Sequence, residues 1–200
     1  MKIKDEPLDD FEAALADVAD VPDWRAVWGP RAGGGPSALA ELRERVLAAT
    51  GWSAEPVSGD ADMRQTGWSF TTPRGSLVVV GADTASFAIS RGGWSAYRLS
   101  QEDYPEALRI LQHQQWPRYL ELVRGRLGEP TYVGSCVDPG FPTEEWQDEY
   151  DARQVGYLAV WRRPGLEFHL YASHAGLEFD PKHPAMSVQH RVRSRRGNDE

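Results

Sequence analysis

Two short stretches of the sequence hold the side chains best suited to chemistry. The first contains three histidines and one aspartate, at His169, His174, Asp180 and His183. Imidazole and carboxylate groups bind zinc, and three of them with an open fourth position make a catalytic centre. The spacing matches no known ligand pattern, so we predict no metal and no other cofactor. A small-molecule pocket or enzyme site near these histidines stays open as an alternative function.

The second stretch is an acidic loop that also carries aromatic residues. From Asp138 to Asp151 there are six acids and no basic residue. Like charges at helical spacing repel, so these acids do not stabilise a local helix. Tyr and Trp often anchor protein interfaces, and surrounding acids steer a basic partner. We predict partner contacts at Asp138, Glu144, Glu145, Trp146, Asp148, Glu149 and Tyr150; the alternative is a loop whose charges only face solvent.

Familiar catalytic signatures are missing from the sequence. It has no GxxxxGK or GxGxxG phosphate-binding loop, no HExxH and no GxSxG. The single cysteine, Cys136, lies at the end of a predicted strand, where no helix N-terminus would lower its pKa. We therefore predict no catalytic residue, and the sequence favours binding over catalysis.

Composition restricts the kinds of partner. The 200 residues carry a net charge of −8, which argues against a general nucleic-acid or membrane-surface binder. One cysteine cannot form an intramolecular disulfide, and no apolar run is long enough for a signal sequence or a membrane span. We expect a cytoplasmic protein. Nineteen arginines against three lysines (Lys2, Lys4 and Lys182) indicate a high-GC bacterial genome.

The elements that must position these stretches follow from hydrophobic periodicity. An acidic amphipathic helix with Leu8, Phe11, Leu15 and Val18 on one face precedes a Gly/Pro-rich linker. We expect this segment to attach through Trp24 and Trp28, with its acids solvated. Further helices are predicted at 37–50 and 100–127, the latter interrupted near Trp116 by Pro117. Strands are predicted at 68–71, 77–80, 85–89, 94–99, 131–136, 155–161, 166–170 and 186–192.

These elements predict an α+β fold, with an antiparallel sheet of hairpins and meanders and helices packed on one face. The predicted organisation is a helix and linker over 1–35, one α+β domain over 36–192 and a disordered tail over 193–200. Two parts of the domain share one order, a helix ending in Gly, then Glu-Pro, then a hairpin that turns at Gly75 or Gly165. That order indicates either two duplicated α-β-β-β units or a chance repetition common in α+β proteins.

The chain also resembles, in general style, the uncharacterised and immunity-type families of high-GC bacteria that accompany secreted toxins. The residues behind the resemblance are Gly128-Glu129-Pro130-Thr131-Tyr132, the 158–163 strand with its Pro164-Gly165 turn, and the Trp-rich meander from Trp68 to Trp94. The resemblance assigns no residue a role. It implies a protein that binds and blocks a cognate toxin, and a regulatory or scaffold domain is a further alternative.

Overall fold

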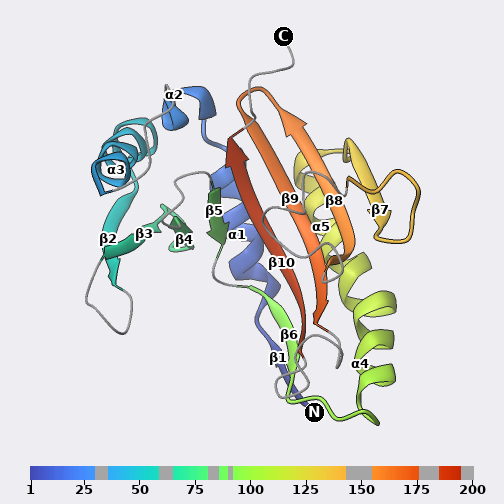
Figure 1. Ribbon diagram of the computed structural model, residues 1–200. Coiled ribbons are helices and arrows are strands. Elements are labelled where there is room, and N and C mark those ends of the chain that lie inside the picture. Colours follow the sequence, from blue (N-terminus) through green and yellow to red (C-terminus); the bar gives the residue numbers. More distant parts are fainter. Residues whose placement is uncertain are drawn as a thin grey trace. The chain divides into compact units, whose positions relative to one another are not determined.

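A computed structural model describes residues 1–29, 36–58, 65–80, 86–89, 92–142, 155–175 and 185–194 (Figure 1). Helices and antiparallel strands make up these residues, which confirms the predicted α+β class. The chain forms two compact units. The first unit comprises 1–8, 92–161 and 169–190, and the second comprises 9–91, 162–168 and 191 onward. The predicted boundaries at residues 35 and 192 stay a prediction.

The described part of the second unit contains three helices. The apolar face of α1 (Leu8–Ala19) is buried at Phe11, Leu15 and Val18, as its periodicity predicts. Asp23 caps α2 (Trp24–Trp28) by accepting hydrogen bonds from the next backbone N–H groups. Helix α3 (Pro36–Thr50) ends at Gly51, whose φ of 69° suits a residue without a side chain.

An aromatic cluster joins α2 to the second unit's strands. The ring centroids of Trp24 and Trp28 lie 5.6 and 4.9 Å from that of Phe87. Phe87 in turn lies 6.0 Å from Phe70, which lies 6.4 Å from Trp52. Helix α2 is therefore part of this unit's core, and the Trp24 indole also donates a hydrogen bond to the Val18 carbonyl of α1 at 3.1 Å.

The strands of the second unit form a meander that confirms the predicted strands at 68–71, 77–80 and 85–89 as neighbours, but the predicted strand at 94–99 does not continue it and pairs elsewhere. Strands β2 (Ser53–Ser58), β3 (Gln65–Thr71), β4 (Leu77–Val80) and β5 (Ser86–Ile89) pair in sequence, and β5 then pairs with the end of β10 (Ala185–Ser194). Periodicity did not predict β2, because Pro56 interrupts it. Pro56 is tolerated since β2 lies at the end of the strand order, where one side of its backbone needs no partner.

The first unit has strand order β1-β6-β10-β9-β8-β7. Figure 1 shows β8 (Val155–Arg163), β9 (Leu166–Ala175) and β10 side by side as three long strands. Strand β7 (Tyr132–Ser135) pairs with β8, and β6 (Trp94–Tyr97) pairs with both β10 and β1 (Lys2–Asp5). Strand β1 is short and polar, so the sequence did not reveal it.

The helices of the first unit meet at an irregular turn. Helix α4 (Tyr104–Ile110) passes through a π-helical turn, η1 (Leu111–Gln115), into α5 (Trp116–Leu127). Pro117 explains the turn, because its ring would clash with the carbonyl four residues earlier in a regular α-helix. The predicted interruption near Trp116 is confirmed.

Two buried side chains fasten α5 within the first unit. The hydroxyl of Tyr119 donates a hydrogen bond to the Gly92 carbonyl at 2.6 Å, and the indole of Trp161 donates to the Gly128 carbonyl at 2.7 Å. Burial raises the pKa of Tyr119 well above its usual range, so the hydroxyl stays protonated as a donor.

At the C-terminal end, β10 includes Arg193 and Ser194, two residues that the sequence placed in a disordered tail. Arg193 pairs with Ser86 of β5. Within the part of the chain that the structure describes, no helix combines the length and the apolar character needed to cross a membrane.

Candidate functional site

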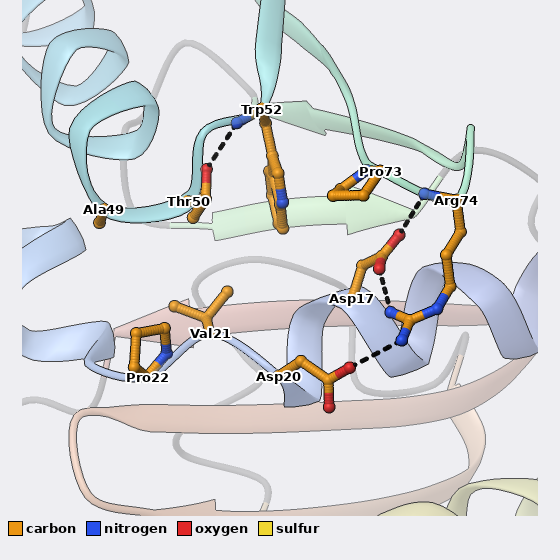
Figure 2. Close-up of a pocket in the computed structure, with 9 residues that line it drawn as sticks. All are labelled: Asp17, Asp20, Val21, Pro22, Ala49, Thr50, Trp52, Pro73 and Arg74. Atoms are coloured by element: carbon orange, nitrogen blue, oxygen red, sulfur yellow. Dashed lines mark hydrogen bonds and ion pairs between the residues drawn. The ribbon is translucent and has the colours of Figure 1, made fainter.

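A pocket of about 410 Å³ opens in the second unit, between the end of α1, the end of α3 and the turn that joins β3 to β4 (Figure 2). Its volume lies within the range of about 300–1,000 Å³ that is common for ligand sites. Charged, hydroxyl and apolar side chains share its wall, which consists of Asp17, Asp20, Val21, Pro22, Ala49, Thr50, Trp52, Pro73 and Arg74.

An ion-pair network forms the charged side of the pocket. The Asp17 carboxylate accepts hydrogen bonds from the backbone N–H of Arg74, at 3.2 Å, and from its guanidinium. The same guanidinium donates to Asp20 at 2.9 Å (Figure 2). These bonds, to Asp20 first and then to Asp17, raise the pKa of Arg74 above its usual value. Arg74 is therefore a permanent cation shared by two carboxylates.

The two carboxylates differ in their access to solvent. The side chain of Asp17 is 2% exposed, whereas those of Asp20 and Arg74 are 48% and 47% exposed. A buried charge is costly unless it is paired and hydrogen-bonded, and Arg74 supplies both the ion pair and the hydrogen bonds for the buried Asp17 carboxylate. Asp20 presents its charge to the pocket mouth.

The β3–β4 turn places Arg74 against α1. The backbone N–H of Gly75 donates to the Thr72 carbonyl at 2.9 Å, and that of Ser76 donates to the Thr72 hydroxyl at 3.1 Å. Gly75 has a φ of 78°, a left-handed conformation that glycine adopts without strain. The Ser76 hydroxyl lies 3.4 Å from the Asp10 carbonyl and so adds a second contact with α1.

The opposite side of the pocket comes from the residues at the end of α3. The Thr50 hydroxyl donates to the Val46 carbonyl at 2.7 Å and accepts from the Trp52 backbone N–H at 3.2 Å. These two bonds hold the exit from the helix in one conformation. Figure 2 shows the Trp52 ring extending into the pocket between Thr50 and Pro73, so the ring forms part of its apolar wall.

The lining suits recognition of a cation. Two carboxylates and one guanidinium give the wall a formal net charge of −1, next to apolar surface from Val21, Trp52 and Pro73. Among the described residues that line the pocket there is no histidine or cysteine, and their one hydroxyl, that of Thr50, donates to the Val46 carbonyl at the end of α3. The arrangement can therefore bind a positively charged group that carries an apolar stem.

Asp17 corrects the sequence-based interpretation of α1. Its spacing placed it outside the apolar face, among acids expected to be solvated, yet its side chain is almost fully buried. Helical periodicity could not identify it, because its partner Arg74 is 57 positions away in the sequence. Asp9, Asp10, Glu12 and Asp20 of the same segment are exposed, as expected.

Of the predicted partner-binding residues, the structure describes Asp138. This exposed residue accepts a hydrogen bond from the Ser135 backbone N–H through its carboxylate and so closes the turn after β7. Nearby, Tyr132 and Cys136 pack against a buried cluster that includes Phe141 and Leu158. The remaining predicted contacts, Glu144, Glu145, Trp146, Asp148, Glu149 and Tyr150, lie outside the described residues.

The histidine-rich stretch is described in part. His169 is buried within β9, with 1% of its surface exposed, and His174 belongs to the same strand. Asp180 and His183 lie outside the described residues. Over the described ranges, no group of three or more His, Cys, Asp or Glu side chains is arranged to hold a metal ion.

Comparisons of the chain with protein-family models, with curated proteins and with solved structures found no match.

Proposed function

We propose that this chain is a protein-binding domain whose partner presents a basic surface, in the manner of an immunity-type inhibitor that blocks a cognate toxin. The observation that carries the proposal is the acidic surface of α1 and of the pocket at its end. Asp9, Asp10 and Glu12 are exposed on the helix, and the half-exposed Asp20 stands at the pocket mouth. A basic protein would be attracted to this surface and captured rapidly.

The acidic loop supplies a second proposed contact. Its sequence places Trp146 and Tyr150 among five acids, and aromatic side chains provide most of the binding energy at many interfaces. In a nuclease toxin, the cleft that receives nucleic acid is basic. An acidic loop with aromatic anchors would occupy such a cleft and exclude the substrate.

The test needs a defined partner. If a large secreted protein is encoded beside this chain's gene, its C-terminal domain is the partner to test. The measurements are the Kd of that domain for the chain, and the survival of cells that express the domain with and without the chain. Saturable binding and protection are expected. If the neighbouring domain neither binds nor is neutralised, the proposed function is wrong for that partner class.

Charge reversal then locates the interface. One variant carries Glu144, Glu145, Asp148 and Glu149→Lys, and a second carries Asp9, Asp10 and Glu12→Lys. A control variant carries Glu102, Glu121 and Glu129→Lys, three exposed acids of the first unit. We expect the first two to lose binding and the control to retain it, with little change in Tm. Full protection by the loop variant would remove the loop from the interface.

A further inference from the structure

We propose that the pocket of the second unit receives one basic side chain of the partner, a lysine ammonium or arginine guanidinium carried on its alkyl stem. This inference rests on the proposed protein-binding function and specifies the group that is recognised. The pocket combines a charged mouth with apolar walls, and a basic side chain has the same two parts: methylene groups that pack on apolar surface and a terminal charge.

The charges favour a cation over an anion. Arg74 is the pocket's cation, and its guanidinium already donates to Asp17 and to Asp20. An anion drawn to Arg74 would approach both carboxylates and be repelled by them. A cation would meet a net negative lining, and it would reach Asp20 without burial of that carboxylate, since the Asp20 side chain is 48% exposed.

The pocket is also held in shape before any ligand arrives. Asp17 is buried and fixed by two hydrogen bonds from Arg74, which locks the β3–β4 turn onto α1. The Thr50 hydroxyl donates to the Val46 carbonyl and accepts from the Trp52 backbone N–H, and these two bonds fix the backbone between α3 and Trp52. A preformed site loses little conformational entropy on binding, which is the condition under which one side chain can contribute substantially to an interface.

Small probes test the pocket separately from the partner. N-acetyl-lysine amide and N-acetyl-arginine amide carry the proposed groups, and N-acetyl-norleucine amide is the uncharged comparison. Chemical shifts of the Trp52 indole N–H and the Arg74 backbone N–H report binding. We expect a Kd on the order of 1 mM for the two cations, weakened by added salt. Equal binding of norleucine amide, or no shift at Trp52 with either cation, overturns the proposal.

Two matched pairs of variants test the location. Asp20→Asn removes the exposed charge and should weaken cation binding about three- to fivefold, whereas Glu41→Gln, at an exposed ion-paired acid of α3 outside the pocket, should not. Ala49→Phe fills the pocket and should abolish binding, whereas Ala48→Phe, at the adjacent exposed position, should not. Equal binding by the two alanine variants would overturn the assignment, and Tm shows whether each variant is folded.

The partner itself identifies the source of the cation. Ala49→Phe should weaken partner binding by tenfold or more relative to Ala48→Phe. If the probes bind but both variants bind the partner equally, the pocket serves a free organic cation and the partner assignment is overturned. If the probes bind and no partner does, the proposed function fails while the pocket's chemistry stands. If a partner binds and the probes do not, the proposed function stands and the assignment of the pocket to a basic side chain is overturned.

Discussion

The buried carboxylate of Asp17 accepts hydrogen bonds from both the backbone and the guanidinium of Arg74, a residue 57 positions further along the chain. This pair fastens the β3–β4 turn to α1 and forms one side of the pocket (Figure 2). Asp20 shares the same guanidinium from a half-exposed position. Asp17 thus holds the β3–β4 turn against α1, whereas Asp20 supplies the exposed negative charge of the pocket.

Asp17→Asn and Asp20→Asn should separate these roles. We expect Asp17→Asn to lower the free energy of unfolding by about 1–3 kcal/mol, because a buried hydrogen bond to a charged group is weakened. Asp20→Asn should change it little, since exposed ion pairs contribute little. Urea unfolding of the two variants provides the comparison. A larger loss for Asp20→Asn would contradict this division.

Gly165→Ala should destabilise the protein more than Gly75→Ala. Both glycines have positive φ, 74° and 78°, so alanine costs about 1–2 kcal/mol at either turn. A methyl group at Gly165 would also lie 2.6 Å from Arg25 Cγ and 2.9 Å from its backbone nitrogen, whereas at Gly75 it meets open space. Chemical denaturation should give Gly165→Ala a lower free energy of unfolding than Gly75→Ala. Equal stabilities would show that the Arg25 contact is absent in solution.

Tyr119→Phe should cost about 1–2 kcal/mol of unfolding free energy. The substitution removes the 2.6 Å hydrogen bond to the Gly92 carbonyl but keeps the ring in the core. Tyr157→Phe is a suitable comparison, because the Tyr157 side chain is only partly buried and its ring stacks on Trp116 in a way that phenylalanine preserves. Thermal melts should show a lower Tm for Tyr119→Phe than for Tyr157→Phe. The prediction is wrong if both variants melt at the temperature of the parent.

Asp103 makes a pH-dependent contribution to stability. The hydrogen bond from the Met1 amine, followed by those from Ser100, lowers the pKa of Asp103 from 3.8 to about 2. A lowered pKa in the folded state stabilises the protein above pH 3.8, and this contribution is lost as pH falls towards 2. The stability difference between the parent and Asp103→Asn should therefore shrink between pH 4 and pH 2. A difference independent of pH over that interval would contradict the assignment.

Local signals in the sequence determined most of the elements. Strand β4 was predicted with its observed ends, because Leu77–Val80 is a continuous apolar run between turns. Helix α3 was placed within one residue, since its apolar period stops at Gly51. The interruption before α5 followed from Pro117 alone. Each of these depends on backbone preferences and side-chain spacing within a few residues.

Only the tertiary structure decided which polar residues serve the pocket and which short strands pair. Strand β1 is formed by hydrogen bonds to β6, about ninety positions away, and β2 tolerates Pro56 only because it lies at the end of the strand order. Asp17 is an acid outside the apolar spacing of α1, like its solvated neighbours. Its burial depends on the ion pair with Arg74, which lies on another element. Contacts of this kind carry no local pattern. The sequence by itself therefore determined the longer helices and the apolar strands, whereas tertiary contacts determined β1, β2 and the residues of the site.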